Sequence, residues 1–344
     1  LKYANFDGLS WHTTTIDRGQ SFVDSNGTSL YTDEGRSNKI LLNKFNGEYP
    51  YINYYSVYHS SGDIKRVKFA KFVGAGNGNC NGDNAWHCEW MDGMDQTPEQ
   101  IDRSKYISSY MFKPEQSSSE HAVYINENNI LELTIGPGSG GQQCGENNNW
   151  RCDILIDDNI LEGVSAHSDR YSTVYNRYAI SYIKADGTLN VAHFVQSGGN
   201  CGLGIYAGAL QCDAIDSGLN IANDVLTSVH VENGNPHLAY LKNSVIKYAT
   251  KVGAGSGNCG PNNEWQCDGI IAGERYPSLI VEGDKKIVAY FKASGGGSGL
   301  AVARYVGSGG NCGTGSVAGK WQCDIVDQIG IDAGSFRDTS IVTT

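Results

Sequence analysis

The sequence predicts an all-β protein built from repeats of one four-stranded unit. Three observations support this prediction. A loop with two cysteines occurs five times, short runs alternate apolar and polar residues, and no segment shows a sustained helical period. All ten cysteines fall in these loops, and a sixth copy without cysteines lies within residues 1–17. We expect one disulfide in each loop, joining Cys80 to Cys88, Cys144 to Cys152, Cys201 to Cys212, Cys259 to Cys267 and Cys312 to Cys323.

Each repeat contains four strand-like runs, which we call A, B, C and D in chain order. Run A opens the repeat, as in residues 105–110, 226–231 and 278–281. Run B reads apolar-x-apolar-x-Tyr, and run C alternates up to a small residue before the cysteine loop. Run D begins with Trp or Leu and ends near an acid, as from Leu210 to Asp216. We expect the tyrosines of run B to be core residues with hydroxyls bonded to the backbone; they are Tyr54, Tyr124, Tyr182, Tyr240 and Tyr290.

Four-stranded units at a spacing of roughly 40–65 residues are typical of propeller blades. Six D runs predict a six-bladed β-propeller in a single domain over residues 1–344, with the cysteines in the C–D hairpins. Residues 338–344 look like run A of the blade whose runs C and D lie in residues 1–17, so the two ends are expected to close the ring. This blade lacks a run B: it has three strands, or the chain continues beyond the printed sequence, which we expect. The other blades are expected at residues 28–92, 105–157, 169–216, 226–271 and 276–327.

Composition narrows the functional classes. The formal net charge of −11, with no basic stripe, argues against a nucleic-acid partner, and no apolar run approaches a membrane span. Paired cysteines in Gly/Asn-rich hairpins favour disulfides in an oxidising compartment over zinc, because each repeat offers only two sulfurs. The sequon at Asn26 predicts a glycosylation site. We therefore expect a secreted protein, and the sequence makes no prediction of its oligomeric state.

The loops between run D and the next run A differ strongly between repeats, which is typical of a functional site grafted on a repeated scaffold. A charged pair recurs in them, and its arginines are expected to ring the mouth of the central funnel. These arginines are Arg103, Arg170, Arg275 and Arg337, accompanied by Tyr106, Tyr171 and Tyr276. The guanidinium group suits carboxylates, phosphates and other paired oxygens. The alternative is that each arginine pairs with its neighbouring acid or with the next blade as a structural contact.

Histidines and an aromatic loop add further candidates. His230 lies in run A and is expected to point into the funnel, while His167 and His59 are expected in loops on the same face. A structural role is the alternative for each histidine. Tyr55 and Tyr58 belong to an aromatic B–C loop that forms either a wall of the site or an exposed insertion. The chain has no phosphate loop, nucleophile elbow, dinucleotide fingerprint or calcium-loop spacing, so we expect no cofactor and no metal.

The stretches from Gly307 to Asp324 and from Asn235 to Ala249 resemble a repeat found in secreted propeller proteins of bacteria and fungi. The resemblance covers nearly the whole chain and implies the fold more than a function. Two functional groups of fungal secreted propellers are similar to this pattern: the glycosylated hetero-Diels–Alderases of tropolone sesquiterpenoid biosynthesis, and lyases that act on uronate-containing polysaccharides. No catalytic residue of either group maps onto this sequence.

Three functions follow as hypotheses, each with a small-molecule or glycan ligand. The favoured one is a hetero-Diels–Alderase that joins a tropolone-type quinone methide to a terpene alkene. In this enzyme Arg170, Arg275, Tyr171 or Tyr276 would donate to the substrate oxygen, and His167 or His230 would assist loss of water. A uronate lyase would use the same residues to neutralise a carboxylate and to take the C5 proton. A lectin is the third hypothesis, although the variable loops favour one specialised site over several equal ones.

Overall fold

The computed structural model describes residues 2–6, 11–17, 21–23, 29–43, 49–58, 64–80, 83–92, 107–112, 119–126, 129–135, 142–144, 150–169, 178–221, 226–292 and 299–327. The chain divides into two compact units, Leu1–Leu155 and Ile156–Thr344. All strand pairs in the described part are antiparallel, and the prediction of an all-β protein is confirmed. The six-bladed ring and the single domain stay predictions.

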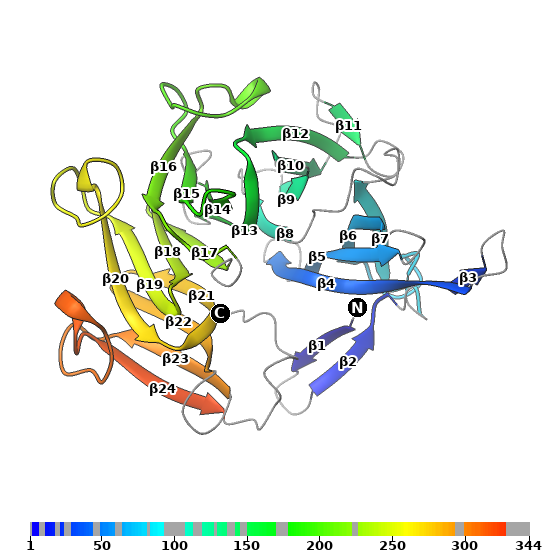
Figure 1. Cartoon of the computed structure of the whole chain (residues 1–344). Coiled ribbons are helices and arrows are strands. Elements are labelled where there is room, and N and C mark those ends of the chain that lie inside the picture. The colour runs from blue at the N-terminus through cyan, green and yellow to red at the C-terminus, as the bar shows by residue number, and fades with distance from the viewer. Residues whose placement is uncertain are drawn as a thin grey trace. The chain divides into compact units, whose positions relative to one another are not determined.

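The first unit contains a two-stranded hairpin and two larger sheets (Figure 1). The hairpin pairs β1 (Lys2–Phe6) with β2 (Trp11–Thr15). One sheet has the order β3-β4-β5-β6-β7, and the other has the order β11-β12-β10-β9-β8. Their strands are β3 (Ser21–Val23), β4 (Ser29–Asn43), β5 (Tyr49–Tyr58), β6 (Ile64–Phe72), β7 (Trp86–Asp92), β8 (Ile107–Phe112), β9 (Ser119–Asn126), β10 (Asn129–Ile135), β11 (Gln142–Cys144) and β12 (Trp150–Asp157).

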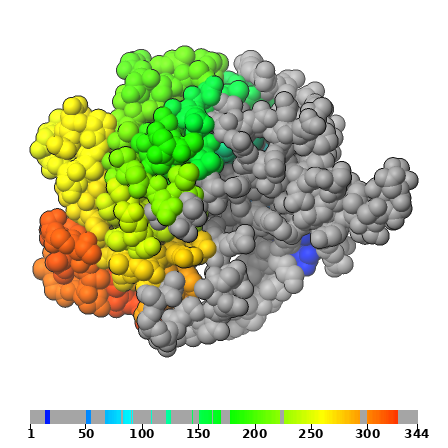
Figure 2. Space-filling view, in the orientation of Figure 1, coloured from blue at the N-terminus to red at the C-terminus, as the bar shows by residue number. Residues whose placement is uncertain are grey.

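The second unit contains three four-stranded meanders that follow one another in chain order (Figures 1 and 2). The first strands of the three sheets, which we call the inner strands, lie side by side. The disulfide hairpins lie at the opposite edge of each sheet. The strands are β13 (Ile160–Ser168), β14 (Tyr178–Lys184), β15 (Leu189–Phe194), β16 (Leu210–Asp216), β17 (Thr227–Glu232), β18 (Asn235–Lys242), β19 (Val245–Lys251), β20 (Trp265–Ala272), β21 (Glu274–Glu282), β22 (Lys285–Lys292), β23 (Gly299–Tyr305) and β24 (Trp321–Asp327).

Two of these sheets begin earlier than the sequence predicts. The sheet expected from residue 169 starts with β13 at Ile160, because a tight turn through Asn159 (φ 51°) connects it directly to β12. His167 therefore lies on an inner strand and not in a loop, and Arg170 follows that strand instead of preceding it. The last sheet starts at Glu274, so Arg275 and Tyr276 also belong to a strand.

All five predicted disulfides are confirmed. The Gly-Asn-Cys motif before four of them has a physical reason that is clearest at Gly310. A Cβ atom there would lie 2.0 Å from the carbonyl oxygen of Trp321, so only glycine allows this approach. The amide of Asn311 donates to the Cys323 carbonyl (3.0 Å) and accepts from the Cys323 N–H (2.7 Å), which extends the β-ladder with a side chain. The same pair of bonds is made by Asn79, Asn200 and Asn258.

A β-bulge occurs near the end of β7, β16, β20 and β24, each the last strand of its sheet. The bulged residues with the same position are Met91, Ile215, Ile270 and Val326. Ile215 is 1% exposed and packs against Val229, Leu238 and Tyr240 of the following sheet. Its carbonyl accepts a hydrogen bond from Gly260 N in the next disulfide hairpin (3.0 Å). The disulfide hairpins therefore join neighbouring sheets within a unit.

The tyrosines of run B are buried as predicted, but the predicted hydrogen bond to the backbone is wrong for three of them. Their hydroxyls donate to carboxylates that follow the preceding run D. The pairs are Tyr54 with Asp17 (2.8 Å), Tyr182 with Asp158 (3.3 Å) and Tyr240 with Asp216 (2.8 Å). In these three cases an acid at or just after the end of run D bonds to the tyrosine of the following sheet.

Candidate functional site

The inner strands of the second unit are joined by side chains that act as hydrogen-bond acceptors. Val229 N–H donates to Ser165 Oγ (3.1 Å), and Val231 N–H donates to His167 Nδ1 (3.0 Å). These bonds satisfy the backbone donors of β17 that face β13, which a sheet partner would otherwise take up. Ser228 repeats the arrangement one sheet later, where it accepts from Leu279 N–H at 3.0 Å. We call this contact between β13 and β17 the inner-strand seam.

His167 and His230 form a stacked pair on this seam. Their ring centroids lie 3.9 Å apart, and the ring planes are tilted by 30°. Because Nδ1 of His167 accepts a backbone N–H, the proton of the neutral ring lies on Nε2. His230 follows Ser228 by two positions, as His167 follows Ser165, so the two histidines occupy equivalent positions on neighbouring strands.

A third histidine continues the row away from the seam. His237 pairs with His230 across β17 and β18, and its Nδ1 lies 2.6 Å from the Tyr248 hydroxyl and 3.0 Å from Thr250 Oγ1. Burial, and to a smaller extent the charges of His230 and Lys286, lower the pKa of His237 to about 4. His237 is therefore neutral near pH 7, and the lone pair of Nδ1 can accept a hydrogen bond from one of these two hydroxyls.

The structure brings together only some of the residues that the sequence singles out as site candidates. His167 and His230, which the sequence places in different elements, lie together on the seam. Arg275 lies at the start of β21, and Tyr276 has a positive φ of 57° and packs near Phe291. Tyr55 and Tyr58 belong to β5, whose side chains there are not described. Outside the described residues lie Asn26, His59, Arg103, Tyr106, Arg170, Tyr171 and Arg337.

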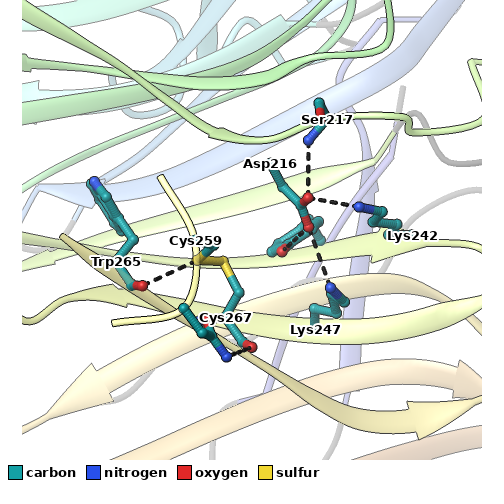
Figure 3. Close-up of polar contacts among 9 residues, drawn as sticks. Asp216, Ser217, Lys242, Lys247, Cys259, Trp265 and Cys267 are labelled. Carbon is teal, nitrogen blue, oxygen red and sulfur yellow. Dashed lines mark hydrogen bonds and ion pairs between the residues drawn. A yellow bond between two sulfur atoms is a disulfide. The ribbon is translucent and has the colours of Figure 1, made fainter. Parts of the chain in front are cut away.

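An ion-pair cluster around Asp216 was not predicted from the sequence (Figure 3). Its carboxylate accepts from Lys242 Nζ (2.6 Å), Lys247 Nζ (3.3 Å) and the Tyr240 hydroxyl. Burial opposes ionisation of Asp216, but the hydrogen bonds from Lys242 and Tyr240 and the charge of Lys247 outweigh it and lower its pKa. The signal in the sequence is the spacing Tyr-x-Lys at the end of run B, which recurs at Tyr182 and Lys184.

Comparisons with known proteins assign this chain to no family. No family model, curated protein or solved structure matches the chain. Among the described residues, no three His, Cys, Asp or Glu side chains come together as a metal-binding group. In the same part of the chain, no helix is long and apolar enough to cross a membrane.

Proposed function

We propose that this chain forms a secreted six-bladed propeller whose ring is closed by a blade from its two ends. The five disulfides support an oxidising compartment. The last described sheet supports the closing blade, because its outer face has apolar residues without the cover found elsewhere. Val326 is 60% exposed, whereas Ile215 and Ile270 at the same bulge position are each 1% exposed. Leu300 is 37% exposed, whereas the equivalent Ile246 is fully buried.

Closure can be tested at this bulge. If the closing blade buries the Val326 side chain, Val326→Ala should lower the free energy of unfolding by about 2 kcal/mol. Ile270→Ala, in a face that is already covered, is the matched control and should cost about 2–5 kcal/mol. A Val326→Ala variant that unfolds at the same denaturant concentration as the wild type would contradict closure on this face.

We further propose that the inner-strand seam is a proton-transfer site, and that the protein is a lyase acting on a uronate-containing polysaccharide. The observation that supports this is the stacked pair of His167 and His230. Two stacked imidazoles repel each other when both are protonated, so at most one of the two rings carries a positive charge. One ring can then donate a hydrogen bond while neutral, and the other can take up and release a proton. The two imidazoles also favour a polar ligand over the apolar pocket that a hetero-Diels–Alderase needs.

The proposed roles follow from the hydrogen bonds. His167 keeps its proton on Nε2, because Nδ1 accepts Val231 N–H, and it donates that proton toward the glycosidic oxygen. His230 is the base that takes the C5 proton. The C5–H electron pair becomes the C4–C5 double bond, the C4–O4 bond breaks, and the proton from His167 goes to O4. His230, which then carries the C5 proton, returns a proton to Nε2 of His167 through solvent, so both imidazoles end neutral. The reaction gives one unsaturated uronate end and one new hydroxyl end, with no change in oxidation state overall.

The test is the absorbance of the unsaturated product when wild-type protein is mixed with polyuronates. His167→Asn is the informative variant. The Asn oxygen replaces Nδ1 as acceptor for Val231 N–H, but asparagine has no imidazole N–H to protonate the glycosidic oxygen. We expect this variant to stay folded and to lose turnover by about 10²–10⁴-fold. Ser165→Ala is the matched control: it removes the neighbouring seam bond, so it should lower the melting temperature while turnover is kept.

The same experiment separates the other two hypotheses. A hetero-Diels–Alderase would turn over tropolone-type quinone methides and leave polyuronates intact. A lectin would bind neutral sugars and form no product with any of these compounds. Full turnover by His167→Asn would refute the proposed role of the histidine pair, because only the hydrogen bond to Val231 would then matter.

A further inference from the structure

A polar groove of about 400 Å³ lies between two neighbouring sheets of the second unit, away from the inner-strand seam. One wall is formed by the turn between β18 and β19 and by β20. The other wall is the disulfide hairpin of the next sheet. Its volume is in the range of small-molecule sites, roughly 300–1,000 Å³. The side chains that give the groove its chemistry are Lys242, Asn243, Lys247, Asp268, Thr314 and Ser316.

Backbone hydrogen bonds to β20 hold the Cys312–Cys323 hairpin in place beside the groove. Thr314 N–H donates to the Gly269 carbonyl at 2.9 Å, and Gly313 N–H donates to the Ile270 carbonyl at 2.8 Å. A Cβ at Gly269 would lie 2.2 Å from Thr314 Oγ1, so glycine is required for this close approach. Ser316 Oγ lies 3.5 Å from the Asp268 carboxylate. The wall is therefore held in place before any ligand arrives.

The charges at the groove are balanced, because two lysines are offset by Asp268 and Asp216. Two lysines, Lys242 and Lys247, line it together with one carboxylate, Asp268. The two ammonium groups share the single carboxylate of Asp216, which approaches them from the preceding sheet (Figure 3). Each ammonium group has three N–H donors, so donors remain for a bound anion. This local balance contrasts with the net charge of −11 of the whole chain.

The groove's polar wall is not a repeated feature of the scaffold. In the Cys201–Cys212 hairpin, which has the same length, the residues equivalent to Thr314 and Ser316 are Leu203 and Ile205. Those two apolar side chains are 42% and 61% exposed. A device that only joins sheets would not need hydroxyl groups in one copy and apolar groups in another. The polar wall therefore indicates a ligand at this groove.

We propose that this groove binds one uronate unit of an acidic polysaccharide as a second, non-catalytic site. The ammonium groups of Lys242 and Lys247 would bind the sugar carboxylate, and Asp268 with the Thr314 and Ser316 hydroxyls would bond to the sugar hydroxyls. The choice of an acidic sugar rests on the proposed function, whereas the site itself rests on the groove. Such a site would bind a second part of a long chain, outside the inner-strand seam, without taking part in the chemistry.

The test is isothermal titration calorimetry, which measures the Kd for polygalacturonate oligosaccharides. Neutral galactose oligosaccharides are the reference ligand. The His230→Gln variant serves as background so that turnover does not disturb the titration. We expect Lys242→Gln to raise the Kd for the acidic oligosaccharide about tenfold. Lys184→Gln is the matched control, because Lys184 makes the same kind of ion pair with Asp158 (2.7 Å) but does not line the groove. It should leave the Kd unchanged.

The outcomes distinguish this proposal from the proposed lyase. Equal Kd values for the two lysine variants would overturn the groove site, even if the wild type forms unsaturated product. Binding that depends on Lys242, in a wild type that forms no such product, would support the groove site and refute the lyase. Binding of the neutral oligosaccharides with the same Kd would overturn the acidic ligand class. Melting temperatures of both variants should fall only slightly, because each variant loses one partly exposed ion pair.

Discussion

The buried histidine on β18 makes stability depend on pH. His237 has a pKa of about 4 in the folded chain, chiefly because it is buried, whereas an unfolded histidine has a pKa of about 6.5. Between these two pH values the unfolded chain binds a proton that the folded chain does not. The free energy of unfolding therefore falls as the pH drops from about 6.5 toward 4, and the stabilising contribution is fully present above about 6.5.

The magnitude follows from the size of the shift. A difference of about 2.5 pH units corresponds to about 3 kcal/mol at 1.36 kcal/mol per unit. The comparison variant is His237→Asn, whose side-chain oxygen can replace Nδ1 as a hydrogen-bond acceptor beside Tyr248 and Thr250 but does not become charged. Between pH 7 and pH 4, wild-type protein should lose about 3 kcal/mol more stability than His237→Asn.

The assay is urea unfolding followed by tryptophan fluorescence at several pH values, with linear extrapolation of the unfolding free energy. His87→Asn is a matched control, because the His87 side chain is 43% exposed. This variant should lose as much unfolding free energy between pH 7 and pH 4 as the wild type does. Equal losses in wild type and His237→Asn would refute the reasoning. A wild type that becomes more stable on acidification would refute its sign.

Further predictions concern the disulfide hairpins. Gly310→Ala should cost about 3 kcal/mol in urea unfolding, because the new Cβ would lie 2.0 Å from the Trp321 carbonyl oxygen. Asn311→Ala should cost about 2 kcal/mol by the same measurement, since it leaves a backbone N–H and a carbonyl unpaired. Replacing both Cys312 and Cys323 by alanine should cost about 3 kcal/mol, and the difference should vanish when both proteins are measured under reducing conditions.

The sequence predicts the repeated parts of the fold well, because each repeat is an independent observation of the same physical constraint. Ten cysteines in five equivalent loops leave one simple pairing, and the structure has that pairing. Period-two alternation likewise predicts runs B, C and D. It fails at β13, because its bulged pairing with β14 breaks the alternation at Gly163 and because the turn at Asn159 is too short to be recognised as a loop.

The site is harder to predict because it depends on contacts between repeats. Nothing in the local sequence places His167 against His230, since their contact requires the strand boundary at Ile160 and the packing of β13 on β17. The acceptor roles of Ser165 and His167 are also invisible in a single sequence, because they arise only when two inner strands lie side by side. The bulge residues are a similar case, since their burial is set by the following sheet.

Comparison between repeats separates scaffold from site. The acid-to-tyrosine bond recurs at Asp17, Asp158 and Asp216, so it is explained by the joining of sheets and needs no ligand. His167 and His230 are equivalent to each other, but the inner strand of the next sheet has Ile280 at that position. A purely structural acceptor would be needed on every inner strand. Because the imidazoles occur on only two neighbouring inner strands of this unit, their chemistry, and not only their hydrogen bonds, is the feature that a function would use.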